Sequence, residues 1–400
     1  MTPREFALDI VRRLRSAGFQ ALWAGGCVRD QLLGHEPHDY DVATDARPEQ
    51  VQALFRRTVA VGLSFGVVEV LGPKPLRVQV ATFRSDGDYS DGRRPTSVTY
   101  STPEADARRR DFTINGVFYD PIAERVIDYV GGERDLNARV VRAIGDPVQR
   151  FTEDKLRLIR AVRFAARFEF EIDPATAAAI RTMAHQIVVV AAERIADELR
   201  KILTDRHRAR AVRLLAELEL LTPIVPEVAH DPFVLESALN RLAHLGEPVT
   251  FPLALGALLA DAGPEAPRRV ADHLRLSNAE AERAIWLVTH RASLIGADRL
   301  PLCRLKPILA HSGINELLAL LRTEAERLTD AEFCERCLRD WPAERINPPP
   351  LVTGEDVRAL GLPPGPRFKS LLDAVRQAQL DEEISTRDQA LTRLAELTSR

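Results

Sequence analysis

The sequence of 400 residues contains few cysteines and no long apolar run. Its four cysteines give no disulfide framework, which excludes a disulfide-stabilised miniprotein and agrees with a reducing compartment. No stretch approaches the roughly 18 to 20 apolar residues that span a bilayer, and residues 1–19 have a charged helical pattern rather than that of a leader. With 45% hydrophobic and 28% charged residues, disorder is also excluded. We therefore expect a cytoplasmic protein of several modules with no membrane partner.

The chain also lacks an excess of positive charge. Its formal net charge is −3, whereas a nucleic-acid-binding domain usually carries a clear positive excess. The distribution is uneven, however, with net charges of −1 over residues 1–149, +5 over 150–213 and −7 over 214–400. The basic middle segment indicates a local contact with an anion. Coding bias is the alternative reason, because arginine outnumbers lysine 50 to 5 along the whole chain.

Short β-type runs lie only in the first 145 residues, at Ala21–Ala24, Tyr40–Thr44, Val67–Leu71 and Leu76–Phe83. From Thr152 onward, apolar residues recur every three or four positions and no strand pattern returns. The sequence therefore predicts an α+β protein, with a mixed sheet and helices in an N-terminal head and an all-helical remainder.

The densest chemical signal lies in residues 22–44. A strand ends at Gly25 and Gly26, where a helix begins, and this arrangement suits a phosphate. Asp39 and Asp41 follow at positions i and i+2, which on a strand face the same side. Two such carboxylates repel each other unless a hard cation lies between them, and Mg²⁺ combines a few carboxylates with substrate phosphates. The pair thus predicts a metal clamp for nucleotidyl transfer, although an isolated D-x-D is also common on solvated strand ends.

The compound pattern G-G-x-V-R-D followed by D-x-D-x-A-T resembles the class II CCA-adding and poly(A) polymerase nucleotidyltransferases of the polymerase-β-like superfamily. This resemblance implies a polymerase-β-like nucleotidyltransferase head. It also implies that Gly25, Gly26 and Arg29 hold the incoming triphosphate. Asp39 and Asp41 would be the catalytic residues and would bind Mg²⁺.

One position departs from the superfamily pattern, which has a third carboxylate on a neighbouring strand. The matching segment, residues 77–84, carries Gln79 where an acid is expected. An amide can ligate a metal or bridge to it through water, but it cannot act as a base. Glu69 on the preceding strand is the alternative. Without a third acid, Asp39 and Asp41 would carry the metals alone.

Three adjacent arginines stand beside an aspartate at residues 108–111. Guanidinium groups grip phosphate oxygens and a carboxylate accepts from a sugar hydroxyl, although an exposed basic turn has the same composition. The segment resembles the family's R-R-D motif. The resemblance implies that Arg110 faces the phosphates, that Asp111 faces the ribose 2′-hydroxyl and that Asn115 supports both.

Asp154 and Arg157 are three residues apart in a helical pattern, so we expect them on one face of a helix. An ordinary intrahelical ion pair is the simpler interpretation. The alternative is base recognition, because a carboxylate accepts from the amine of cytosine or adenine and a guanidinium donates to the adjacent ring acceptor. Uracil and guanine present a carbonyl there and would be repelled. The pair resembles the family's E-D-x-x-R motif, which implies an amino-acid template.

The same helical region supplies the basic segment. The resemblance implies that Arg160 and Arg163 also bind the nucleotide. We expect some of the other arginines to be packing stems and a subset to bind RNA phosphates. The candidates for RNA binding are Arg167, Arg206, Arg208 and Arg210.

Proline-containing turns predict four parts, and the resemblance gives each a role. Residues 1–147 form the catalytic head and residues 148–222 a helical neck that recognises nucleotide and RNA. Residues 223–346 form a body with a degenerate trace of an HD-type module, and residues 347–400 a tRNA-binding tail.

The implied function is template-independent addition of CMP and AMP, from CTP and ATP, to the tRNA 3′ end, with no stable protein partner. A polar stretch within Phe83–Arg110 matches a loop that the family associates with adding the final adenosine. A poly(A) polymerase is the alternative, although Gly62–Phe65 lacks the basic pair expected of the bacterial enzymes. An A-adding tRNA enzyme is another alternative. The Asp39 and Asp41 pair argues against a non-catalytic RNA-binding protein.

Overall fold

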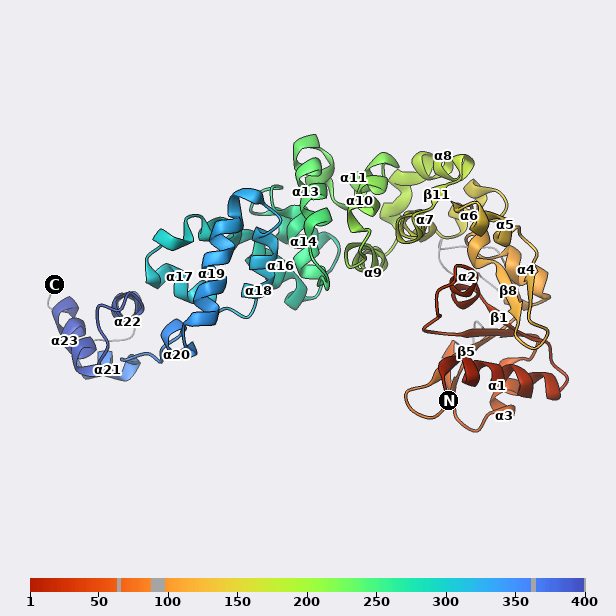
Figure 1. Cartoon of the computed structure of the whole chain (residues 1–400), viewed down its shortest axis with the longest axis horizontal. Coiled ribbons are helices and arrows are strands. Elements are labelled where there is room, and N and C mark those ends of the chain that lie inside the picture. Colours follow the sequence, from red (N-terminus) through yellow and green to blue (C-terminus); the bar gives the residue numbers. More distant parts are fainter. Residues whose placement is uncertain (63–65, 88–97, 361–364, 399–400) are drawn as a thin grey trace. The chain divides into compact units, whose positions relative to one another are not determined.

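The computed structural model describes residues 1–62, 66–87, 98–360 and 365–398. The chain divides into two compact units, 1–229 and 230–400 (Figure 1). Among the described residues, no helix combines the length and the apolar composition needed to cross a membrane. Three sequence predictions lie partly outside the described residues. They are the missing basic pair at 62–65, the adenosine-associated stretch, which includes 88–97, and the tail, which includes 361–364.

The head contains a mixed sheet, which confirms the expected fold class. In the described residues its strand order is β3-β4-β5-β2-β1-β8-β9, and all neighbours are antiparallel except β2 and β5. The strands of this sheet are β1 Ala21–Ala24, β2 Asp41–Thr44, β3 Thr58–Gly62, β4 Val67–Leu71, β5 Arg77–Thr82, β8 Val117–Asp120 and β9 Arg125–Asp128. Two short pairs complete the strands: β6 Arg84–Asp86 with β7 Val98–Tyr100, and β10 Val140–Val141 with β11 Glu171–Ile172.

The expected strands all form: β1 and β4 have the expected bounds, β2 begins one residue later, and β5 is one residue shorter at each end. Three sheet strands, β3, β8 and β9, were not expected. The absence of strands after Thr152 was also a wrong prediction, because β11 pairs in parallel with β10.

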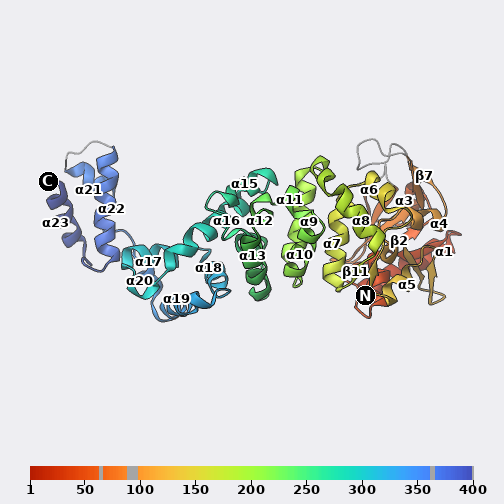
Figure 2. The same cartoon turned by 90° about the horizontal axis from the view of Figure 1, so that it is seen from above.

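The first unit contains twelve α-helices in its described residues. They are α1 Pro3–Ser16, α2 Gly26–Leu32, α3 Pro48–Leu54, α4 Pro103–Arg108, α5 Gly132–Asn137, α6 Pro147–Glu153, α7 Leu156–Phe168, α8 Pro174–Met183, α9 Ala192–Leu203, α10 Arg208–Glu217, α11 Leu221–Ile224 and α12 Pro226–Ala229. Helices α7, α9 and α10 pack against one another, as both views show (Figures 1 and 2). The predicted head and neck therefore both lie in this unit.

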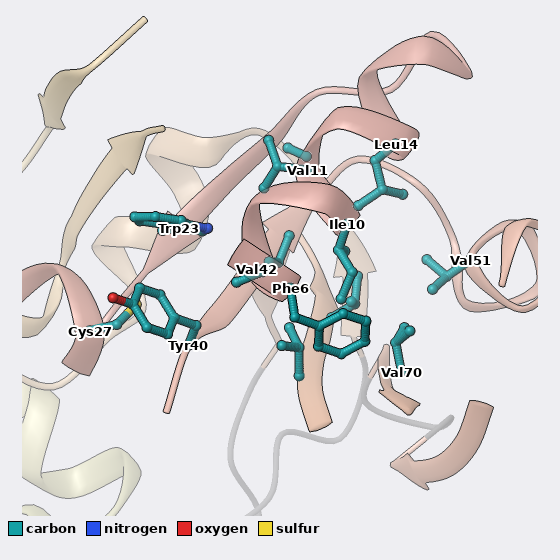
Figure 3. Packing of buried hydrophobic residues seen from close by; sticks show 14 of the residues in the cluster. Phe6, Ile10, Val11, Leu14, Trp23, Cys27, Tyr40, Val42, Val51 and Val70 are labelled. Atoms are coloured by element: carbon teal, nitrogen blue, oxygen red, sulfur yellow. The ribbon is translucent and has the colours of Figure 1, made fainter. Parts of the chain in front are cut away.

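Helix α1 shows how the sequence builds the core of the head. Thr2 and Glu5 form a capping box that satisfies backbone donors at the start of the helix. Apolar side chains at three- and four-residue spacing then bury one face of α1, against the strands that carry Val42 and Val70 (Figure 3). The packed face consists of Phe6, Ile10, Val11 and Leu14. This core fixes the sheet on which Asp41 stands.

The second unit is helical throughout its described part. Its α-helices are α13 Pro232–His244, α14 Phe251–Leu259, α15 Ala266–His273, α16 Asn278–Arg291, α17 Leu302–Leu309, α18 Ile314–Leu321, α19 Leu328–Asp340, α20 Ala343–Ile346, α21 Gly354–Ala359, α22 Pro366–Leu380 and α23 Arg387–Thr398. An ionic network whose most buried members are Arg241 and Glu324 joins several of them. Asp261 pairs with Arg241 at 2.6 Å and with Arg291 at 2.8 Å, and Arg291 also pairs with Glu324 at 2.6 Å.

Replacing Arg241 with methionine should destabilise the second unit by about 3 kcal/mol, because the carboxylates of Asp261 and Glu324 would then share Arg291 as their nearest cation. Arg241 is only 2% exposed. The measurement is the free energy of unfolding in denaturant. Arg322→Met is the matched control, since it removes a more exposed pair with Glu335, and it should change this energy by less than about 1 kcal/mol. Equal effects of the two substitutions would contradict the prediction.

Candidate active site

A pocket of about 510 Å³ in the first unit gathers most of the predicted site residues. Its described lining includes six arginines and three aspartates, an excess of three positive charges. The predicted residues in the lining are Gly25, Gly26, Arg29, Asp41, Arg110, Asp111, Asn115, Asp154, Arg157 and Arg160. The remaining lining residues are Arg109, Leu156, Phe164 and Arg194. Asp39, expected to bind the metal, and Arg163, expected to bind the nucleotide, do not line this pocket.

The glycine turn forms one wall. Gly25 has φ +72° and ψ −126°, a conformation that side-chain-bearing residues rarely adopt. A Cβ at Gly25 would also lie only 3.0 Å from Nη1 of Arg110. Glycine is therefore required by the backbone, and its small size lets the predicted phosphate-binding arginine approach the start of α2.

Asp41 is the first residue of β2 and opens into the pocket. The expectation that Asp39 shares its strand is wrong, because Asp39 precedes the strand in an exposed bend. The two carboxylates still interact. Protein atoms packed around Asp41 raise its pKa, the charge of Asp39 raises this pKa further, and Arg110 acts in the opposite direction.

The strand register shows which residue lies beside Asp41, where the superfamily pattern has a third carboxylate. Gln79 on β5 is the direct partner of Asp41, and Glu69 on β4 is the partner of Gln79. With strands about 4.8 Å apart, Glu69 stands two strand spacings from Asp41. In the described residues no group of three or more histidine, cysteine or acidic side chains could hold a metal ion. A pair of carboxylates nevertheless fits Mg²⁺, which commonly takes one or two and completes its shell with water and substrate phosphates.

Asp111 is fully engaged by protein donors. One carboxylate oxygen accepts from Nε and Nη2 of Arg160 at 2.9 and 2.6 Å. The other accepts from the amide of Phe112 at 2.8 Å and from Asn115 at 3.0 Å. Burial opposes ionisation, but Arg160 and Asn115 hold the pKa of Asp111 well below its usual range. Since a carboxylate offers about four acceptor positions, a ribose hydroxyl would have to displace one of these donors.

Asp154 and Arg157 do not share one continuous helix, so that prediction was wrong. Helix α6 ends at Glu153, Asp154 is extended with φ −148° and ψ 105°, and α7 begins at Leu156. Asp154 accepts from Arg194 at 2.9 Å. Arg157 donates to Glu153 at 2.6 Å. The two residues thus enter the pocket with separate partners, rather than as an ion pair with each other.

The other predicted arginines divide by burial. Arg163 pairs with the buried Glu198 at 2.6 Å. Arg208 is 2% exposed and donates to the carbonyl of Leu203, so it is not on the surface as expected. Arg210 is half-buried and donates to the carbonyl of Phe170, whereas Arg167 and Arg206 are exposed.

Two functional candidates escaped the sequence reasoning. Arg194 holds Asp154 from α9, which lies forty residues further along the chain, so local spacing could not reveal it. Asp106 is buried in α4 and holds both Arg109 and Arg110. Its position three and four residues before these arginines was the available signal.

Known proteins resemble this chain in sequence and in structure. Residues 21–142 match the family model described as Poly A polymerase head domain, and residues 169–231 match Probable RNA and SrmB- binding site of polymerase A. A CCA-adding enzyme of Leuconostoc citreum (strain KM20) is 31% identical over 98% of this chain and 96% of its own. The chain belongs to the CCA-adding enzyme family. The family resemblance expected from the motifs is thereby confirmed.

Other members of the CCA-adding enzyme family match in part or in structure. The enzyme of Bacillus pumilus (strain SAFR-032) is 41% identical over 54% of each chain, so the chain spans about half the length of such curated relatives. The crystal structure of the Bacillus stearothermophilus CCA-adding enzyme in complex with CTP superimposes with a TM-score of 0.83. It is 29% identical, and the match covers 100% of this chain and 98% of that one.

Proposed function

We propose that this protein is a nucleotidyltransferase that adds CMP and AMP, from CTP and ATP, to the 3′ end of tRNA without a nucleic-acid template. One observation carries the proposal. A single pocket joins Asp41 to an arginine-rich wall and to Asp154. The names of the relatives support the same reaction.

The arginines of this pocket would bind the triphosphate. Arg109 and Arg110 offer guanidinium groups to a phosphate beside the glycine turn, and the missing side chain of Gly25 lets Arg110 approach this turn. The carboxylate of Asp111 already accepts four hydrogen bonds from protein donors. We therefore propose that Asp111 influences the ribose indirectly, by holding Arg160. These groups would hold the α-phosphate in line with the primer hydroxyl.

Asp39 and Asp41 would hold Mg²⁺. When bound there, the ion supplies charge stabilisation at the α-phosphate and at the departing pyrophosphate. Gln79 can contribute an amide oxygen but no negative charge, so the two aspartates supply the anionic ligands.

Asp154 and Arg157 would select the base. The carboxylate of Asp154 is held by Arg194 and by the amide of Leu156, which leaves acceptor capacity for the amine of cytosine or adenine. Uracil and guanine would place a carbonyl oxygen against this charge.

We also propose the division into a catalytic head (1–147), a neck (148–222), a body (223–346) and a tRNA-binding tail (347–400). Arg167, Arg206 and Arg210 are the neck arginines that we assign to RNA phosphates. The free cysteines agree with a cytoplasmic location.

The decisive experiment offers the protein four primers with each nucleoside triphosphate separately. The primers are tRNA lacking CCA, tRNA ending in C, tRNA ending in CC, and oligo(A). We expect CMP on the first two, AMP on the third and no extension of oligo(A). AMP incorporation on tRNA ending in CC alone would identify an A-adding enzyme, and extension of oligo(A) would identify a poly(A) polymerase.

A further inference from the structure

Asp106 is a buried aspartate whose carboxylate accepts hydrogen bonds from two consecutive arginines of the pocket. It is 2% exposed and does not line the pocket itself. One oxygen accepts from Nε and Nη2 of Arg109 at 2.9 and 2.6 Å. The other accepts from Nε and Nη2 of Arg110 at 3.2 and 2.9 Å. Each arginine is thus held by two parallel hydrogen bonds.

This arrangement fixes the direction of both guanidinium groups before any ligand arrives. Adjacent positive groups repel each other, and a carboxylate between them removes part of that repulsion. A free arginine side chain loses rotamer entropy when it binds an anion, whereas a restrained one has already lost it. Despite burial, Arg110 and Arg109 keep the pKa of Asp106 below its usual value, so the carboxylate is charged.

The same aspartate also holds the start of the β6–β7 hairpin. The amide of Arg84 donates to Asp106 at 3.4 Å, and Arg109 donates back to the carbonyl of Arg84 at 3.1 Å. The backbone carbonyl of Arg109 accepts from Arg157 at 3.3 Å. Arg109 therefore lies between the hairpin, the pocket wall and the base-reading residue.

We propose that Asp106 is a positioning residue for the triphosphate. It presents Arg109 and Arg110 as a preformed pair of phosphate-binding groups and anchors the hairpin to the same pair. The inference rests on the proposed function. The established family membership does not depend on it.

The test replaces Asp106 with asparagine and measures equilibrium binding of ATP, CTP and inorganic tripolyphosphate. We expect Kd to rise about tenfold for all three ligands, because tripolyphosphate, which has no base, would contact the same two arginines as the nucleotides do. With tRNA as primer, KM for the nucleotide should rise more than kcat falls. Amide hydrogen exchange at Arg84 should accelerate.

Glu104→Gln is the matched control. Glu104 lies on the same helix and pairs with Arg108 on the exposed surface, outside the pocket. The Glu104→Gln substitution should leave tripolyphosphate binding and amide hydrogen exchange at Arg84 unchanged. Asp106→Glu is the second variant, and by keeping the charge it should bind tripolyphosphate more tightly than Asp106→Asn.

Wild-type tripolyphosphate affinity in folded Asp106→Asn would overturn the inference. So would failure of both Asp106 variants to fold, because Asp106 would then have only a structural role. The proposed function can fail separately. A wild-type protein that binds ATP but extends no tRNA would refute the function and leave the positioning role intact.

Discussion

Asp41→Asn should lower the rate of CMP incorporation into tRNA lacking CCA by at least about a thousandfold, equivalent to about 4 kcal/mol of transition-state stabilisation. Asparagine keeps the shape of the side chain but removes one of two negative charges that would bind Mg²⁺. The strand partner of Asp41 is Gln79, so no adjacent acid on that strand can replace the lost charge. Single-turnover incorporation is the measurement, with CTP binding followed in parallel.

Asp45→Asn is the matched control for this substitution. Asp45 follows the same strand, is exposed and accepts from the amide of Gln20 at 2.7 Å, away from the pocket. It should retain nearly full activity and CTP affinity. If Asp41→Asn kept more than a tenth of the wild-type rate, the assignment of Asp41 to the metal would be wrong.

Asp154→Asn should reduce the preference for CTP over UTP by about 10- to 100-fold, the range expected for losing one good base contact of about 1–3 kcal/mol. The amide can donate to the carbonyl of uracil, whereas the carboxylate repels it. Because asparagine is neutral, the substitution also weakens the contact with Arg194. The measurement is the ratio of kcat/KM for the two nucleotides, with tRNA lacking CCA as primer.

The control for base selection is Asp197→Asn on α9. Asp197 pairs with Arg200 on the exposed side of the helix that carries Arg194. It should leave the CTP to UTP ratio unchanged. An unchanged ratio in Asp154→Asn would refute the template role, even if the overall rate fell.

Local features of the site could be predicted from the sequence, because their physical causes are local. A glycine pair between a strand and a helix needs only its own backbone freedom, and Gly25 has a positive φ, which residues with side chains rarely adopt. The strand carrying Asp41 follows from the short β-type run at Tyr40–Thr44. The strands β8 and β9 were missed because tertiary pairing with β1 and with each other stabilises them.

The helix across 153–164 could not be predicted correctly for the same reason. Apolar residues recur at helical spacing throughout this segment, but the helix is interrupted at Asp154. The side chain of Asp154 accepts a hydrogen bond from Arg194 on another helix. Composition also could not separate binding arginines from structural ones. Arg163 and Arg208 differ from Arg160 only in what surrounds them, a buried glutamate and a backbone carbonyl in place of the pocket.

All described residues that line the pocket lie between Gly25 and Arg194, within the first unit. If the proposed function holds, the choice of nucleotide is encoded in less than half of the chain. Under that proposal, substitutions after residue 230 leave the pocket lining unchanged, so the two units are free to diverge at different rates. A chimaera that joins this first unit to a relative's second unit should inherit its nucleotide preference from the first.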